Sequence, residues 1–248
     1  MGNKSILLVV SSILLSGMMI ASAVLYNGVQ SRSNNNNSFS NTVPQQDQND
    51  PVDARNISVD LSEDTPYLGS KSKSKIAIIE FSDFECPFCK KFHDESRKEI
   101  IEQYVKTDKA ILALKDYPLD FHDPLATQQA VAAKCVYEQK GNQAYFDYVD
   151  LIFANTTSGG DGMKKSRLNE LAREIKDLDQ DKFDKCLKEE STLDKVKADM
   201  DFANQNGVNG TPGFIIGKLE NGKVTQGIRI AGALPIETFN QYLDELLQ

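Results

Sequence analysis

The sequence predicts an α/β fold with an inserted helical block. Two observations lead to this fold class: short β-branched runs lie towards both ends of the globular part, and the long stretch between them shows only helical patterns. The chain has 248 residues, which is enough for one large domain or two small ones with a buried core. Its net charge of −8 has the wrong sign for holding a phosphate backbone, so no nucleic-acid partner is expected.

Residues 5–26 form an uncharged, mostly aliphatic run that follows Lys4. About 20 such residues can cross a bilayer as a helix. The small residues Ala21 and Ala23, with Ser22 between them, also fit a signal-peptide cleavage site. Residues 1–26 are therefore expected to be either a membrane anchor or a cleaved signal peptide. Both alternatives predict that the rest of the chain is exported and works outside the cytoplasm, next to the membrane if the segment is retained.

The next segment, residues 27–55, is expected to be a flexible linker. Of the 24 residues from 27 to 50, 15 are Asn, Gln or Ser, and almost no apolar side chain is available for burial. Such a linker behind an anchor would let a domain reach molecules near a membrane. A disordered segment without a role is the alternative.

The globular domain is expected to span residues 56–248. An apolar, β-branched run at 75–81 predicts a central strand, and Pro87 suits the first turn of the helix that follows it. The remaining expected elements, in order, are a helix to about residue 105, a strand at 110–114, a helical insertion at about 122–206, a hairpin with strands 213–217 and 223–230 around Asn221-Gly222, and a closing helix whose apolar face carries Ile236, Phe239, Leu243 and Leu246.

The motif Cys86-Pro87-Phe88-Cys89 lies where the central strand gives way to the helix. Unpaired backbone N–H groups and the positive end of the helix dipole favour an anion at this position, so they favour the Cys86 thiolate. A free thiol with a pKa near 8.5 is only about 3% ionised at pH 7, and such placement can lower the pKa to about 3.5–7. Cys86 is therefore the expected nucleophile, exposed and acidic. Cys89, one turn into the helix, is expected to be buried and to resolve mixed disulfides.

Two other interpretations of this cysteine pair stay open on spacing alone. A zinc site usually needs four ligands from two clusters, and the sequence offers only this pair, His93 and the isolated Cys135 or Cys186. An inert structural disulfide is the other alternative. His93 is expected on the surface and not as a ligand, and His122 is expected only to head a helix.

A second feature is Thr211-Pro212, which lies between Gly210 and Gly213 at the entry to a predicted strand. Proline cannot donate a hydrogen bond to a neighbouring strand, so its place there indicates a special turn, to which a cis peptide bond would be suited.

Three segments resemble the DsbA family of thiol-disulfide oxidoreductases, in the same order: residues 64–69, residues 79–92 with the cysteine pair, and residues 208–214 with Thr211-Pro212. The similarity extends over about residues 56–248. It implies a thioredoxin fold with an inserted all-helical subdomain, Cys86 as the attacking thiol and Cys89 as the resolving thiol. It further implies a cis Pro212 against the thiols and a Thr211 backbone that pairs with an extended client peptide.

The resemblance also concerns Glu80 and Phe88. Glu80 lies six residues before Cys86, where the family carries an acidic residue beneath its active site, and a buried carboxylate has a raised pKa and can exchange a proton with Cys89. Exposure to solvent, or pairing with Lys115, is the alternative. DsbA itself has a histidine at the position of Phe88, so the oxidising strength implied by the family is not carried over.

Cys135 and Cys186 both fall in helical patterns of the insertion. In an oxidising compartment a structural disulfide between them is expected, and closing about 50 residues would add roughly 4 kcal/mol on the chain-entropy model. Two free buried thiols and a second redox pair are the alternatives.

These observations predict an exported enzyme that exchanges disulfides with reduced or misoxidised exported proteins, acting as an oxidase. The cysteine pair would be the redox centre, so no metal and no organic cofactor is expected. Family resemblance implies reoxidation by a quinone-linked membrane partner of the DsbB or vitamin K epoxide reductase-like kind. A disulfide isomerase or reductase, and a non-enzymatic metal-binding module, are the alternative functions.

Overall fold

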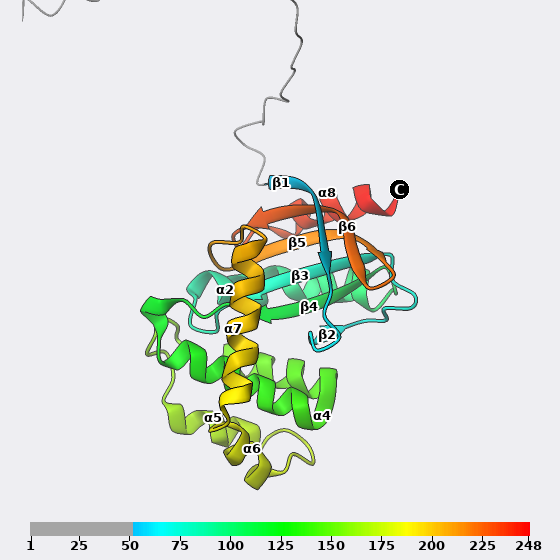
Figure 1. Ribbon diagram of the computed structural model, residues 1–248. Helices are drawn as coiled ribbons and strands as arrows, with labels where there is room; N and C mark the ends of the chain where they lie inside the picture. The colour runs from blue at the N-terminus through cyan, green and yellow to red at the C-terminus, as the bar shows by residue number, and fades with distance from the viewer. Residues whose placement is uncertain (1–51) are drawn as a thin grey trace, which may run out of the picture. The chain divides into compact units, whose positions relative to one another are not determined.

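The computed structural model describes residues 52–248, which form a twisted sheet of six strands with helices on both faces (Figure 1). The spatial order of the strands is β1-β6-β5-β3-β4-β2. The strands are β1 (Val52–Asp60), β2 (Tyr67–Leu68), β3 (Ile76–Ser82), β4 (Ala110–Asp116), β5 (Gly213–Glu220) and β6 (Lys223–Ala231).

Strand β3 lies in the middle of the sheet and leads directly into the cysteine motif. It pairs in parallel with β4 and antiparallel with β5, and all seven of its residues are buried. Because successive side chains of a strand point to opposite faces, a strand covered on both faces reads as a continuous apolar run. The expectation of a central strand at this place is confirmed.

One face of the sheet is covered by the helical segment 87–105 and by α8 (Ile236–Leu247). Segment 87–105 comprises α2 (Pro87–Phe92), α3 (Lys98–Ile100) and the wider helical turns His93–Arg97 and Ile101–Val105. The core on this face contains residues from both sheet and helices, among them Ile76, Ile78, Phe92, Ile100, Phe214, Phe239 and Leu243. Helix α8 buries the apolar face that its sequence predicts.

The opposite face is covered by α7 (Glu190–Gln205) and by the segment after β1. The buried side chains there alternate with those of the first face and include Ala77, Ile79, Phe81, Ile111, Val59, Leu61 and Ala203. Figure 1 shows α7 running from the helical insertion up across the sheet. This helix therefore belongs to both parts of the fold.

The insertion between β4 and β5 consists of α4 (Leu125–Asn155), α5 (Lys165–Ala172), α6 (Gln180–Cys186) and α7. Helix α4 is kinked at Gly141, whose φ of 74° lies in the left-handed region that favours glycine. A separate apolar core fills this subdomain and extends to the two cysteines of the motif. The predicted helical insertion is present, with its first helix starting at Leu125.

Some boundaries differ from the sequence prediction. The sheet already begins at Val52, so residues 52–55, which the composition assigns to the linker, pair with β6 as part of β1. The reason is that β1 is an edge strand held by backbone hydrogen bonds, and polar residues such as Arg55 and Asn56 do not mark it as a strand. The hairpin strand predicted at 213–217 extends to Glu220, and the turn at Asn221-Gly222 has the expected positive φ values.

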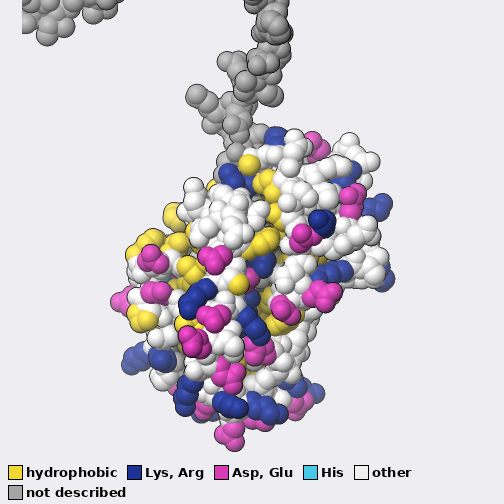
Figure 2. All heavy atoms as spheres, in the orientation of Figure 1, with side chains coloured by type: hydrophobic (Ala, Val, Ile, Leu, Met, Phe, Trp, Pro, Cys, Tyr) yellow, Lys and Arg dark blue, Asp and Glu magenta, His cyan; other side chains and the backbone are white. Residues whose placement is uncertain are grey.

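The predicted anchor or signal, residues 1–26, and the linker up to residue 51 lie outside the described residues. Among the helices within residues 52–248, none is both long and apolar enough to span a bilayer. On the face shown in Figure 2, acidic and basic side chains are interspersed over the described part of the chain.

Candidate active site

Cys86 is the N-cap of α2, with extended backbone angles, and Pro87 is the first helical residue. Proline suits this position because its missing N–H would have no partner in the first turn anyway. Cys89 follows one turn later and faces the core. No disulfide joins the two cysteines in this structure.

The two thiols have opposite pKa shifts. The pKa of Cys86 is lowered from 9.0 to about 6, chiefly by a hydrogen bond from the Cys89 thiol, with further contributions from Thr211 and from the backbone of Phe88 and Cys89 at the helix start. The pKa of Cys89 is raised well above 9.0, because burial and the neighbouring Cys86 both disfavour a second anion. A single negative charge therefore collects on Cys86.

The expectation that Cys86 is exposed is wrong, since the residue is only 4% exposed. Its sulfur lies against the loop before β5, 3.4 Å from the Thr211 carbonyl oxygen, to which the neutral thiol donates. The thiol is acidic, as expected, but chiefly through the hydrogen bond from Cys89 and only to a smaller extent through the helix start. Cys89 is fully buried, in agreement with the sequence prediction.

The Thr211-Pro212 peptide bond is cis. Thr211 lies beside Cys86, although the two residues are 125 positions apart in the sequence. The Thr211 hydroxyl is buried and has no hydrogen-bond partner among the described residues, so it is available to donate to a sulfur anion. A groove of about 140 Å³ runs along this loop between residues 208–213 and 229–232.

Glu80 is buried beneath the motif and not exposed to solvent. It is 1% exposed and points to the face of the sheet covered by segment 87–105, since it alternates with Phe81 along β3. Lys115 pairs with Phe81 in the register, on the opposite face, and its ammonium contacts Asp199 at 2.6 Å. Burial raises the pKa of Glu80, and the charge of Arg97 is the strongest opposing influence.

Phe88, the residue between Pro87 and Cys89, is 61% exposed. It offers an apolar surface next to the thiols and carries no hydrogen-bond donor on its side chain. The other exposed aromatic side chain in the described residues is Phe121, which is 75% exposed.

Glu85, directly before Cys86, has a role that the sequence did not reveal. Its fully buried carboxylate accepts four hydrogen bonds from the helical insertion. The donors are the side chains of Gln129 (2.6 Å) and Thr156 (2.7 Å) and the backbone N–H groups of Gly160 (3.0 Å) and Gly162 (2.8 Å). The only sequence signal for this clamp is an acidic residue next to the motif, and its partners lie more than 40 positions away.

Close packing accompanies this clamp at Gly162. A Cβ atom at this position would lie 2.3 Å from the Ser158 nitrogen and 2.7 Å from a Glu85 carboxylate oxygen. Only glycine lets the loop approach the carboxylate this closely.

The two histidines lie in different surroundings from those expected. His93, expected on the surface, is partly buried, lies against Phe153 and contacts Asp150 at 3.0 Å. His122, expected only to head a helix, is buried and contacts Asp83 in the turn before the motif. Neither environment could be read from the sequence, because both partners are distant along the chain.

Cys135 of α4 and Cys186 of α6 are joined by a disulfide, 51 residues apart. They lie in the apolar core of the insertion, on other helices than the cysteine motif. Within residues 52–248, no three His, Cys, Asp or Glu side chains are grouped so that they could hold a metal ion.

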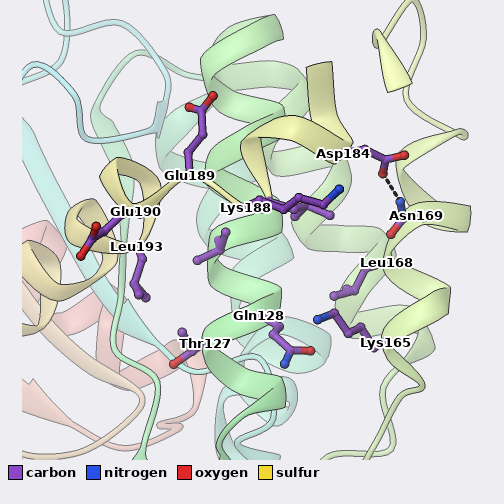
Figure 3. Close-up of a pocket in the computed structure, with 12 residues that line it drawn as sticks. Thr127, Gln128, Lys165, Leu168, Asn169, Asp184, Lys188, Glu189, Glu190 and Leu193 are labelled. Atoms are coloured by element: carbon purple, nitrogen blue, oxygen red, sulfur yellow. Dashed lines mark hydrogen bonds between the residues drawn. The ribbon is translucent and has the colours of Figure 1, made fainter. Parts of the chain in front are cut away.

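The insertion also contains a pocket of about 720 Å³ between α4, α5 and α7, shown in Figure 3. Leu168 and Leu193 line it, together with two lysines, Lys165 and Lys188, and three carboxylates, Asp184, Glu189 and Glu190. None of the residues of the cysteine motif lines this pocket.

A model of the family described as thioredoxin matches residues 61–245, which is most of the chain. Among curated proteins, the chain is 26% identical over 160 residues to "Na(+)/H(+) antiporter NhaA 3" of Salinispora tropica, a match that covers 64% of this chain and only 23% of the antiporter. It is 24% identical over 153 residues to "Probable disulfide bond formation protein D" of Bacillus anthracis, covering 61% of this chain and 70% of that protein.

Among solved structures, the fold is similar to that of alpha-DsbA1 of Wolbachia pipientis, with a TM-score of 0.63 and 24% identity. The match covers 75% of this chain and 92% of the Wolbachia chain. In this chain, that fold carries the acidic thiol at a helix start, the buried second thiol and the cis proline. The chain therefore belongs to the thioredoxin family, and its fold is similar to that of a DsbA protein.

Proposed function

We propose that this protein is an exported disulfide oxidase that donates a disulfide to client proteins through Cys86. The observation that carries the proposal is the contrast between the two thiols, with a pKa of about 6 for Cys86 and a raised pKa for Cys89. Stabilising the Cys86 thiolate stabilises the reduced enzyme, which makes its disulfide more oxidising. The name of the Bacillus anthracis relative agrees with this direction of the chemistry.

The exchange proceeds through a mixed disulfide. A client thiolate attacks the Cys86 sulfur of the oxidised enzyme, the bond between Cys86 and Cys89 breaks, and the electron pair leaves on the Cys89 sulfur, which takes up a proton. A second client thiolate then attacks the client sulfur of the mixed disulfide. The client gains a disulfide, and Cys86 leaves as the thiolate that its surroundings stabilise.

Glu80 is the candidate for the proton transfer to and from Cys89. Burial raises the pKa of its carboxyl group, which favours the protonated form that can give a proton to the Cys89 sulfur. The buried carboxyl lies on the strand that leads into the motif, on the side of the active-site helix.

Clients would bind across Cys86 and the cis-proline loop. An extended client segment would pair with the backbone of Thr211, which lies beside Cys86. The exposed Phe88 ring gives apolar contact area next to the thiol. These features suit reduced or misoxidised chains with unfolded, apolar segments.

The oxidised form would be restored by a quinone-linked membrane partner of the DsbB or vitamin K epoxide reductase-like kind, as the family implies. Residues 1–26 would keep the enzyme near that partner as an anchor, or direct its export as a signal peptide. Cysteines would serve as the entire redox centre, without a metal or an organic cofactor.

The redox potential against glutathione tests the direction of the chemistry. We expect the purified protein to be a stronger oxidant than thioredoxin, whose potential is about −270 mV, and to oxidise reduced ribonuclease. A potential near that of thioredoxin, with activity only in reducing insulin, would show a reductase. Stoichiometric metal after aerobic purification, with neither activity, would show the metal-binding module instead.

A further inference from the structure

Asp83, in the turn between β3 and α2, contacts both cysteines of the motif through its backbone. Its N–H group donates to the Cys89 sulfur at 3.5 Å, and its carbonyl oxygen accepts from the Cys86 N–H at 3.1 Å. A shift of the Asp83 N–H would therefore move a hydrogen-bond donor away from the buried thiol.

The Asp83 carboxylate fixes the position of that backbone. Oδ1 accepts from the N–H of Glu85 at 2.7 Å, while Oδ2 accepts from the N–H of Leu119 at 2.9 Å and lies 2.7 Å from Nδ1 of His122. Asp83 is 1% exposed, so each of these contacts replaces water that cannot reach the carboxylate. Burial raises the pKa of Asp83, and the hydrogen bond from His122 is the strongest effect that lowers it.

His122 is held firmly in this contact. The residue is 5% exposed and lies in the short helical turn Asp120–His122 just before α4. Gly160 of the insertion packs so tightly that a Cβ there would lie 3.0 Å from the His122 Cα. The N–H of Gly160 also donates to the Glu85 carboxylate. The same loop therefore supports Glu85 directly and Asp83 through His122.

We infer that Asp83 and His122 are positioning residues that hold the Asp83 N–H against the Cys89 sulfur and so favour the Cys89 thiolate in the exchange reaction. In the step concerned, the Cys89 thiolate attacks the Cys86 sulfur of a mixed disulfide. The bond between Cys86 and Cys89 forms, the bond from Cys86 to the outer sulfur breaks, and that sulfur leaves with the electron pair and takes a proton from water. This inference rests on the roles proposed above for the two thiols.

The physical reason is the charge on the attacking sulfur. A hydrogen bond to an anion is worth more than one to a neutral thiol, so the Asp83 N–H lowers the free energy of the Cys89 thiolate. Without the His122 contact, the buried carboxylate lacks one of its three donors and no longer fixes the turn. The attack by Cys86 on an outer disulfide does not use Cys89 as nucleophile and should be much less affected.

Oxidised glutathione separates the two steps on the full-length reduced protein. In His122→Leu, formation of the mixed disulfide at Cys86 should stay within about twofold of wild type, and its resolution by Cys89 should slow by about tenfold, the effect of losing one hydrogen bond to a charged atom. In His122→Asn, whose side-chain N–H can replace Nδ1, resolution should return to within about threefold of wild type.

Tyr148→Phe is the matched control. It removes a buried hydrogen bond of the insertion, from the Tyr148 hydroxyl to the Leu168 carbonyl at 2.9 Å, without touching the turn, and both steps should keep their wild-type rates. Equal slowing of both steps in His122→Leu, unchanged resolution, or failure of His122→Asn to restore it would overturn the inference.

A readout without turnover separates this inference from the proposed function. By NMR, the amide hydrogen of Asp83 should exchange about tenfold faster in His122→Leu than in wild type or Tyr148→Phe. A wild-type protein that forms no mixed disulfide at all contradicts the proposed function, whatever the amide does. An Asp83 amide with wild-type protection in His122→Leu contradicts the positioning role, whatever the enzyme oxidises.

Discussion

Cys86 and Cys89 are separated by one helical turn, yet the environment gives them opposite acid–base properties. Cys86 is the residue before the first helical position, where backbone N–H groups point outward, and it receives a hydrogen bond from its partner thiol. Cys89 lies one turn into the helix, where the effect of the helix dipole on a charge has largely decayed, and it is fully buried. The division of roles between the two residues thus follows from where α2 begins.

The lowered pKa of Cys86 predicts a pH dependence of stability. A thiol whose pKa falls from 9.0 to about 6 on folding stabilises the reduced protein fully above its unfolded pKa, and this contribution is lost as the pH falls through 6. The unfolding free energy of the reduced protein, relative to the oxidised one, should therefore rise between pH 6 and pH 8.5. Denaturant titrations of both forms measure this difference. A flat difference, or one that falls with pH, would contradict the thiolate.

Thr211→Val tests the orphaned hydroxyl beside Cys86. Valine keeps the shape of threonine but cannot donate, so the pKa of Cys86 should rise towards its ordinary value and the ratio of thiolate to thiol at pH 6 should fall by about threefold. The ultraviolet absorbance of the thiolate against pH gives this ratio. An unchanged or lower pKa would show that the hydroxyl does not serve the sulfur.

At the scale of elements, the active site depends on contacts between the turn after β3 and the insertion. Glu85 binds α4 through Gln129 and the loop after α4 through Thr156, Gly160 and Gly162. The carboxylate thus accepts four hydrogen bonds. The loop after α4, which supports the cysteine motif, is therefore held in place by the side chain of Glu85, the residue directly before Cys86.

Glu85→Gln should loosen this loop. The amide presents N–H groups to donors that previously met a carboxylate oxygen, so at least one buried pair is lost, at a cost of about 1–3 kcal/mol. Hydrogen exchange at Gly160 and Gly162 should speed up accordingly, and the unfolding free energy should fall. Unchanged protection of both amides would mean that the loop holds its place without the carboxylate.

At the scale of the whole molecule, a buried ionic cluster joins the sheet to the insertion. Lys134 of α4 contacts Asp116 at the end of β4 (3.2 Å) and Asp199 of α7 (2.6 Å), and Lys115 of β4 contacts Asp199 from the other side. All four residues are buried. Burial raises the pKa of Asp116 to about 6, and the charge of Lys134 is the strongest effect that lowers it. The Lys134 ammonium is therefore needed to offset the negative charge of the two aspartates.

Lys134→Met should therefore destabilise the fold strongly. Removing one partner of a buried ion pair leaves a buried charge without compensation, which costs about 3–5 kcal/mol. Lys195→Met is the matched control, because Lys195 contacts Glu138 at 2.6 Å with its side chain 48% exposed, and it should change the unfolding free energy by less than about 1 kcal/mol. Similar losses for both variants in denaturant titrations would refute the structural role of the cluster.

The sequence predicts local features of this molecule well and long-range ones poorly. The strand at 75–81, the helix start at Pro87 and the apolar face of α8 depend on neighbouring residues and on periodicity, and the structure confirms them. The exposure expected for Cys86 was wrong because its cover comes from Thr211, 125 positions away. The contacts of Glu85, Asp83 and His122 are not predicted for the same reason, since pairing across such distances leaves no periodic signal in the chain.

The most direct test of the account is alkylation of the reduced protein at pH 6, with the labelled cysteine identified by mass mapping. We predict that a small reagent such as iodoacetamide modifies Cys86 first, because about half of its thiol is ionised at that pH, while Cys89 remains a buried, protonated thiol. Equal labelling of the two cysteines, or faster labelling of Cys89, would contradict the assignment of Cys86 as the nucleophile and with it the proposed mechanism.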